Sequence, residues 1–258
     1  MFGICPLASG SKGNCIYVGT KGAKILIDLG ISYQSLRKRL SEIGVRVEEI
    51  DAVLITHEHT DHISGLPLLV RKHNIPIFAN KDTAKGIYHA YKITAKFKIF
   101  TTAETFSYAD LIFHPFSVPH DSMDPVGVTL QVGRYKIGVC ADLGFAPSWV
   151  QKALKNCDYL YLEANHEPSM VHASFRPQTY KNRVLSRQGH LSNEACADLI
   201  SHVFHPNLKA VYLAHLSGEC NSKELALKTI REYLEKKEQS VPLLIAHQEV
   251  RSEAITFF

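Results

Sequence analysis

The side chains with the clearest chemical potential lie within residues 56–62, where the sequence is Thr-His-Glu-His-Thr-Asp-His. The apolar run 52–55 directly before them predicts a buried strand that ends where the histidines begin. His57 and His59 then point the same way from an extended chain, while Asp61 and His62 can turn toward a second point. Such imidazole and carboxylate ligands suit two neighbouring ions of zinc, manganese or iron. The alternative is a solvated loop that is only incidentally rich in histidine.

The same arrangement, an apolar run that ends in a metal-ligand residue, recurs along the chain. The residues at these predicted strand ends are Asp28, His57, His120, Asp142, Glu163 and His215. In α/β folds the loops after the C-terminal ends of strands gather along one edge and form the site. The pattern therefore predicts a sheet-based metalloenzyme in which these side chains share one edge.

Two similar halves are suggested by a repeated tripeptide. Residues 126–132 and 135–140 predict a hairpin, and Asp-Leu-Gly follows its second arm at 142–144. The same tripeptide follows the predicted strand 24–27 at 28–30. A short match of this kind favours a duplicated architecture without establishing it.

Helical spacing and capping residues predict the elements between these strands. A helix is expected over residues 63–73, another after a cap at Ser192, and a late one capped by Asn221. Near the N-terminus, the glycine-rich segment 8–14 joins two short strands. It either offers backbone N–H groups to an anion or is only a tight turn.

Composition sets broad limits on the protein. The chain has 258 residues, 45% of them hydrophobic and 21% charged, which predicts one large globular domain over residues 1–258. Its formal net charge of +4 is compatible with a nucleic-acid partner but does not require one.

Features that would direct the chain to a membrane or out of the cell are not evident in the sequence. The first residues lack the basic and apolar regions of a signal peptide, and no apolar run approaches the ~18 residues of a membrane span. The six scattered cysteines form no CxxC pair. They predict free thiols in a reducing cytoplasm, with a structural zinc site as the alternative.

Residues 168–193 contain no acidic side chain. The basic residues in this run are Arg176, Lys181, Arg183 and Arg187, and Phe175 and Tyr180 lie among them. Basic groups can contact phosphates and an aromatic ring can stack on a base, so the run is a candidate nucleic-acid surface. The alternative is a mobile surface loop whose charges have no specific role.

The order of these motifs resembles the metallo-β-lactamase superfamily: HxHxDH, then an isolated histidine, an isolated aspartate and a final histidine. The resemblance implies an α/β fold, an αββα sandwich with two mixed sheets packed face to face and helices outside. It assigns His57, His59 and His120 to one metal ion, Asp61, His62 and His215 to a second, and Asp142 to a position bridging both. Asp28 matches a supporting aspartate.

The family's chemistry is hydrolysis by a hydroxide that bridges two divalent ions, and phosphodiesters, esters, thioesters and lactams all suit it. Asp61 is also expected to orient the attacking water. Glu163 and His190 resemble a pair in tRNase Z-like nucleases, where the histidine protonates the leaving oxygen. His166, close to Glu163 along the chain, is a further residue that could line the cleft.

Four segments bring the resemblance closer to the bacterial YycJ/WalJ-like group, namely residues 9–14, 56–62, 185–193 and 214–217. This group implies a DNA 5′→3′ exonuclease. The alternatives are tRNase Z-like RNA processing, hydrolysis of a small (thio)ester or cyclic phosphate, and a sensor or scaffold without activity. A scaffold should have lost ligands, and none of the seven is missing. Polarity, the choice of DNA over RNA and the oligomeric state stay open.

Overall fold

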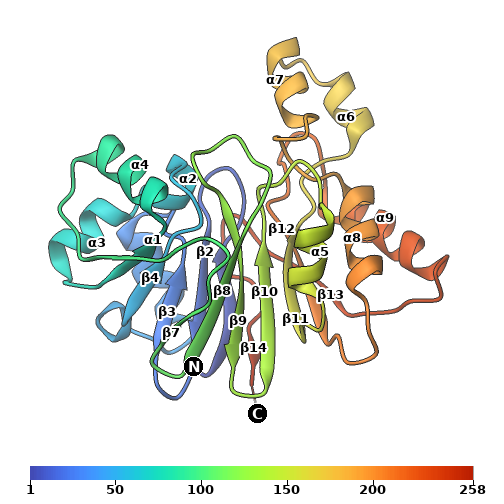
Figure 1. The fold of residues 1–258 in the computed structure, drawn as a ribbon. Helices are drawn as coiled ribbons and strands as arrows, with labels where there is room; N and C mark the ends of the chain where they lie inside the picture. The colour runs from blue at the N-terminus through green and yellow to red at the C-terminus, as the bar shows by residue number, and fades with distance from the viewer. Residues whose placement is uncertain (258) are drawn as a thin grey trace. The chain divides into compact units, whose positions relative to one another are not determined.

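The computed structural model describes residues 1–257, and its strands form two mixed sheets of seven strands each (Figure 1). Contacts group the chain into two compact units. Unit 1 comprises residues 1–115, 122–126 and the segment from Ala246 onward, and unit 2 comprises residues 116–121 and 127–245. The expectation of a single domain over residues 1–258 stays a prediction.

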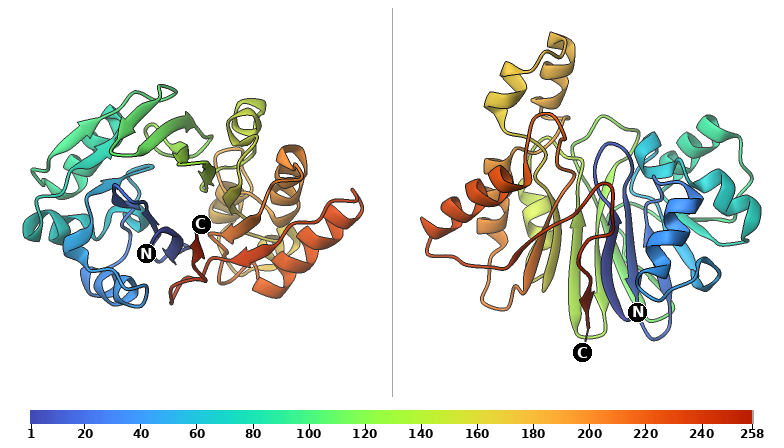
Figure 2. Two further views of the ribbon diagram at one scale, coloured as in Figure 1. Left: turned by 90° about the horizontal axis from the view of Figure 1, so that it is seen from below. Right: turned by 180° about the vertical axis from the view of Figure 1, so that it is seen from behind.

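The first sheet lies in unit 1. Its strands are β1 (Gly3–Ala8), β2 (Cys15–Gly19), β3 (Lys24–Ile27), β4 (Ala52–Leu54), β5 (Ile77–Ala79), β6 (Phe97–Ile99) and β14 (Ile255–Thr256). The order is β14-β1-β2-β3-β4-β5-β6. β1, β2 and β3 pair antiparallel, whereas β3, β4, β5 and β6 pair parallel. The chain ends meet at this sheet, where β14 pairs with β1 (Figure 2).

Helices of unit 1 pack on the apolar side chains of this sheet. They are α1 (Tyr33–Ser41), α2 (Thr60–Ile63), α3 (Leu66–Lys72) and α4 (Lys81–Tyr91), with a 3₁₀ turn at Val47–Glu49. Leu36 and Leu40 are fully buried one turn apart on α1, as an amphipathic helix requires. The single helix expected over residues 63–73 is wrong. The chain breaks at Gly65, whose N–H donates to the carbonyl of Leu29 and not within a continuous helix.

The second sheet has the order β13-β12-β11-β10-β9-β8-β7. Its strands are β7 (Phe106–Tyr108), β8 (Leu111–Ser117), β9 (Val126–Val132), β10 (Tyr135–Cys140), β11 (Tyr159–Glu163), β12 (Ala210–Ala214) and β13 (Leu243–Ile245). β9 and β10 form the predicted hairpin with the predicted bounds. β10, β11, β12 and β13 pair parallel. β11 and β12 are buried along their whole length, which explains why they are apolar apart from Glu163 at the end of β11.

Five helices belong to unit 2: α5 (Ser148–Leu154), α6 (Pro168–Ala173), α7 (Gln178–Val184), α8 (Asn193–Val203) and α9 (Lys223–Glu235). α5, α8 and α9 contribute buried apolar residues to one core with the strands. α6 and α7 stand apart from these three helices (Figures 1 and 2). Ser192 caps α8 as predicted, but the cap of α9 is Ser222. Asn221 instead bonds to Asn193.

The two sheets share one pairing pattern, an antiparallel hairpin whose second strand begins three parallel pairings. The α/β architecture of two mixed sheets with surrounding helices is therefore confirmed, and the similarity of the two halves agrees with the repeated tripeptide. Across residues 1–257, none of the helices combines the length and apolar character that crossing a membrane requires.

Candidate metal centre

The first group of predicted ligands lies in unit 1, where the chain leaves β4 and enters α2. His59 directly precedes α2, and Asp61 and His62 lie in its first turn. The ring centroid of His57 is 4.7 Å from that of His59 and 4.0 Å from that of His62. Asp61 Oδ2 is 3.7 Å from His62 Nε2. The structure thus brings the whole HxHxDH group together at one strand end.

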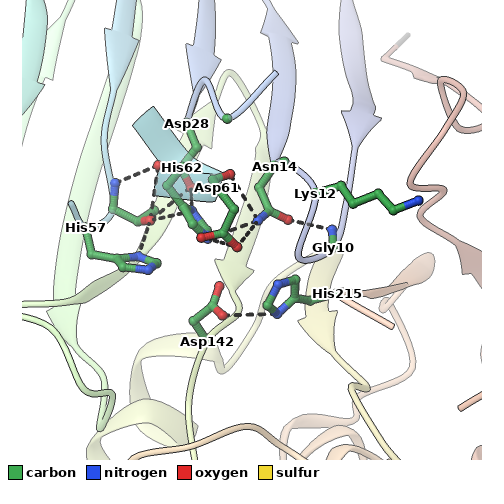
Figure 3. Close-up of polar contacts among 12 residues, drawn as sticks. Gly10, Lys12, Asn14, Asp28, His57, Asp61, His62, Asp142 and His215 are labelled. Atoms are coloured by element: carbon green, nitrogen blue, oxygen red, sulfur yellow. Dashed lines mark hydrogen bonds and ion pairs between the residues drawn. The ribbon is translucent and has the colours of Figure 1, made fainter. Parts of the chain in front are cut away.

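Asp28 supports this group from the neighbouring strand. It follows β3, which pairs parallel with β4, and its backbone has a left-handed φ of 60°. Asp28 Oδ1 accepts the backbone N–H of Thr56 at 2.8 Å, and Oδ2 is 2.8 Å from His62 Nδ1 (Figure 3). Because a buried carboxylate needs donors, the Nδ1 proton of His62 belongs on this side. Nε2 of His62 then carries the lone pair.

The second group lies in unit 2, at the ends of three parallel strands. Asp142 follows β10, Glu163 ends β11 and His215 follows β12. Together with His190, each offers one ligand atom, and these four atoms lie within 4.8 Å of one another. Figure 3 shows the contact between Asp142 and His215, whose Oδ1 and Nδ1 atoms are 3.0 Å apart.

Glu163 is the centre of the hydrogen bonds in this second group. Its side chain is fully buried, and Oε1 accepts Nδ1–H of His190 at 2.8 Å and of His215 at 2.9 Å. Oε2 accepts the backbone N–H groups of Leu143 and Leu191 at 3.0 and 3.1 Å. Burial alone would raise the pKa of Glu163, but the charge of His190 and the two imidazole hydrogen bonds lower it. Glu163 therefore stays an ionised acceptor.

His120 is held in unit 2 by Gly189, whose carbonyl oxygen is 3.1 Å from Nδ1. Burial lowers the pKa of His120, although nearby Asp142 acts in the opposite direction, so the neutral form that binds metals is favoured. His114, six residues earlier, lies inside β8, and its Nδ1 is 3.3 Å from the hydroxyl of Thr105. Its different setting supports His120 as the strand-end residue.

The donor set fits a divalent transition metal. In His62, His120 and His215, Nδ1 faces a carboxylate or carbonyl oxygen, which leaves Nε2 as the nitrogen with a lone pair. Metal-binding histidines are oriented in this way, with the second nitrogen bonded to a carboxylate or carbonyl group. Imidazole nitrogens beside the Asp142 carboxylate suit zinc, manganese or iron. The clustered histidine and aspartate residues are thus a potential metal site.

Every basic residue predicted to contact substrate has a partner inside unit 2. Arg176 pairs with Glu219 and Arg183 with Asp121. Lys181 Nζ donates to the carbonyl of His172 at 2.7 Å, and the guanidinium of Arg187 lies 3.7 Å from the ring centroid of Phe145. The segment that is acid-free in sequence is therefore partly neutralised in space. It is also not one continuous loop, because half of it forms α6 and α7.

Three polar residues that contact predicted ligands were not predicted from the sequence. Thr56 bonds to Asp28 and lies 3.1 Å from His57 Nδ1, and Asn165 donates to the carbonyl of His215 at 2.7 Å. Asn14 contacts Asp61 and His62. None of these side chains is a usual metal ligand. The signals in the sequence were that Thr56 begins the 56–62 stretch and that Asn14 ends a glycine-rich turn.

Known proteins resemble this chain over most of its length. The model of the Metallo-beta-lactamase superfamily matches residues 8–213. Exodeoxyribonuclease YycJ of Bacillus anthracis is 33% identical over 234 residues, which cover 90% of this chain and 88% of that protein. Exodeoxyribonuclease WalJ of Streptococcus pneumoniae serotype 2 is 35% identical over 228 residues, covering 87% and 85%.

A solved structure supports the same fold. The metallo-beta-lactamase fold protein YhfI from Bacillus subtilis superposes with a TM-score of 0.73 at 16% identity, covering 96% of this chain and 97% of that one. With the sequence comparisons, this superposition confirms the predicted resemblance and the αββα fold class.

Proposed function

Because the chain belongs to the metallo-β-lactamase superfamily, we propose that it is a dinuclear metal-dependent phosphodiesterase that degrades DNA as a 5′→3′ exonuclease. That it is a hydrolase of this superfamily follows from the family match and from its relatives. DNA as the substrate is supported by the similarity to two exodeoxyribonucleases over at least 85% of each chain. The polarity rests on the motifs shared with the YycJ/WalJ-like group.

The proposal assigns seven ligands to two metal ions. The residues assigned to it are His57, His59, Asp61, His62, His120, Asp142 and His215. Two bound ions of zinc, manganese or iron would make water a nucleophile near neutral pH and polarise a phosphoryl oxygen. The Asp61 side chain is 24% exposed, so water can reach it, and we assign it the orientation of that water.

The contact between His190 and Glu163 is the observation that carries the phosphodiesterase proposal. With Nδ1–H donated to Glu163, a second proton on His190 lies on Nε2, at the opposite edge of the ring. Glu163 and Asp142, whose Oδ1 is 3.4 Å from His190 Nδ1, stabilise the resulting imidazolium. His190 is partly exposed whereas Glu163 is fully buried. We therefore assign His190 as the general acid that protonates the leaving oxygen and Glu163 as the residue that orients it.

The helices α6 and α7 are proposed to hold the DNA strand. Phe175, between them, is fully exposed at 108% and is placed to stack on a base. The ion pairs of Arg176 and Arg183 are exposed to solvent, and exposed pairs add little to stability, so a phosphate can replace the carboxylate at small cost. Within residues 1–257, neither Lys181 nor Arg187 pairs with a carboxylate, and both complete the proposed phosphate contacts.

Two further features belong to the proposal. The two units are taken as parts of one domain over residues 1–258, because the relatives match across both. A cytoplasmic location is supported by the cysteines, all six of which are buried free thiols.

The test is cleavage of DNA and RNA, each labelled at the 5′ or the 3′ end, by purified protein with Mn²⁺ or Zn²⁺. The expected result is release of label first from 5′-labelled DNA, with little turnover after dialysis against a chelator. Preference for RNA would favour tRNase Z-like processing, and turnover confined to small esters or cyclic phosphates would favour a small-molecule hydrolase. No cleavage of any nucleic acid, with bis-p-nitrophenyl phosphate also inert, would contradict the proposal.

A further inference from the structure

Asn14 is fixed beside two of the proposed ligands by its backbone. It is 4% exposed and lies at the end of the glycine-rich turn between β1 and β2. Its N–H donates to the carbonyl of Asp61 at 2.8 Å, and its own carbonyl accepts from the N–H of Gly30 at 2.8 Å. A side chain on Gly30 would meet the Asp61 carbonyl oxygen at 1.6 Å, so the three segments are in close contact. Asn14 therefore has little freedom to move away from Asp61.

The orientation of the Asn14 amide follows from its hydrogen bonds. Oδ1 accepts the backbone N–H of Gly10 at 2.8 Å. If the amide were flipped, the Nδ2 donor would face the Gly10 N–H donor, so the orientation is fixed. Nδ2 is then directed at the HxHxDH group, 3.3 Å from Asp61 Oδ2 and 3.0 Å from His62 Nε2 (Figure 3). One amide group thus faces two neighbouring ligands.

The hydrogen bond between Asn14 and His62 has a defined direction. Asp28 takes the Nδ1 proton of His62, so Nε2 must accept from the Asn14 amide. This lone pair is the one that His62 would give to a metal ion. The two N–H groups of Asn14 Nδ2 match the two acceptors, Nε2 of His62 and Oδ2 of Asp61.

We propose that Asn14 is a positioning residue for the ion held by Asp61 and His62. The inference rests on the proposed metal centre. Before the ion binds, the amide holds both ligand atoms toward one point. An ion held by His62 would occupy the lone pair on Nε2, and the amide would then keep only its contact with Asp61. Outer hydrogen-bond partners of a ligating carboxylate, as Asn14 is for Asp61, typically contribute 10–100-fold to metal affinity.

The specific prediction is that metal affinity falls for only one of the two ions. In Asn14→Ala, the ion at Asp61 and His62 should bind about 10–100-fold more weakly. The other ion, assigned to His57, His59 and His120, should bind as in the wild type. A residue that only stabilises the turn would instead lower the melting temperature and leave both affinities unchanged.

Asn80 offers a matched control in the same unit. It is also buried, at 3% exposure, and its side chain likewise accepts a backbone N–H, that of Thr83 at 2.8 Å. Its Nδ2 donates to the carbonyl of Asp124 at 2.7 Å. Within residues 1–257, Asn80 makes no hydrogen bond to a proposed ligand, so Asn80→Ala should lower stability without changing the binding of either ion.

The experiment titrates metal-free wild type, Asn14→Ala and Asn80→Ala with Zn²⁺ by calorimetry and counts bound ions after dialysis against graded chelator. Two ions in the wild type and in Asn80→Ala, with one selectively weakened in Asn14→Ala, is the expected result. Equal or tighter binding of both ions in a folded Asn14→Ala, or equal weakening of both, would overturn the role of Asn14. A wild type that binds no Zn²⁺ or Mn²⁺ would instead remove the proposed centre itself.

A second measurement needs no variant at position 14. In isotope-labelled wild-type protein, the side-chain amide signals of Asn14 should shift with one equivalent of Zn²⁺ and not with the other, since only one ion takes the lone pair of His62. The Asn80 side-chain signals should stay unchanged throughout. Asn14 signals that shift with neither equivalent of Zn²⁺ would count against the inference even if Asn14→Ala fails to fold.

Discussion

The halves of the molecule can be compared most directly at their two Asp-Leu-Gly turns. Asp28 in unit 1 and Asp142 in unit 2 each follow the second strand of an antiparallel hairpin, with left-handed φ values of 60° and 56°. The leucine after each aspartate is fully buried. Added side chains at Gly30 and Gly144 would both collide with backbone. The turn is thus the same structural device in both halves.

The neighbouring strand gives each aspartate a different role. The loop after β4 surrounds Asp28 with donors, the N–H and hydroxyl of Thr56 and the imidazole of His62. The segment after α7 and the loop after β12 bring the imidazoles of His190 and His215 to Asp142. One turn therefore presents a carboxylate that supports a ligand, and the other presents a carboxylate that is itself the proposed ligand. The backbone supplies the position, and the adjacent loops decide the chemistry.

The largest effect is expected at the turn of unit 2. Asp142→Asn should lower phosphodiester turnover by ~10³-fold or more, because metal ions contribute several kcal/mol and each 1.4 kcal/mol is a factor of ten. The bound-metal count, measured by elemental analysis, should fall as well. A variant with full metal content and wild-type turnover would show that the two turns do not differ in the proposed way.

His190→Ala should lower turnover by ~10²–10⁴ while the bound-metal count stays that of the wild type, because His190 is assigned to proton transfer and not to ligation. The exposed His202 on α8 provides the control, since within residues 1–257 its Nδ1 contacts only Asp198 of its own helix. His202→Ala should match the wild type in turnover. Unchanged turnover in His190→Ala would remove this residue from the mechanism.

A smaller effect is expected at the turn of unit 1. In Asp28→Asn the carboxylate acceptor for His62 is lost, and metal affinity should fall by about 10–100-fold, as for other outer partners of metal-binding histidines. Saturating metal should restore much of the turnover, which it cannot do for Asp142→Asn. Titration of activity against free Zn²⁺ or Mn²⁺ separates the two variants. If excess metal restored turnover in both variants or in neither, the assignment of Asp28 as a supporting residue and Asp142 as a ligand would be wrong.

The sequence was most informative where one local property decides structure. The two strands of the 126–140 hairpin have the predicted bounds because burial and turn residues suffice to set them. Strand ends likewise located Glu163 and His215, since parallel strands end at one edge. These features depend on neighbours along the chain.

Features that depend on distant segments were not predictable in the same way. Asn14 contacts Asp61 across 47 positions, and nothing near it in sequence indicates that partner. Arg183 looked unopposed within its run, yet it pairs with Asp121, 62 positions away. Asn221 is a good capping residue by type, but the neighbouring Ser222 caps α9 because Asn221 is bonded to Asn193. In each case a long-range contact overrode a correct local preference.

The last prediction concerns stability and compares two buried histidines, one in each unit. Nδ1 of His62 in unit 1 contacts Asp28, whereas Nδ1 of His166 in unit 2 has no hydrogen-bond partner among residues 1–257. His166 is 2% exposed, and burial lowers its pKa to about 4, against the raising effect of Glu163. In the unfolded chain its pKa is about 6.5, so between these values the unfolded state binds the extra proton.

Stability should therefore be lost as the pH falls below about 6.5, and this residue should cost the folded state up to ~2 kcal/mol at pH 5 relative to pH 7. Denaturant unfolding of the wild type and of His166→Phe at both pH values measures the difference. The variant should lose less stability on acidification, while His202→Phe, with an exposed ring, should follow the wild type. Parallel curves for all three proteins would mean that His166 is not held neutral, and the contrast with His62 would disappear.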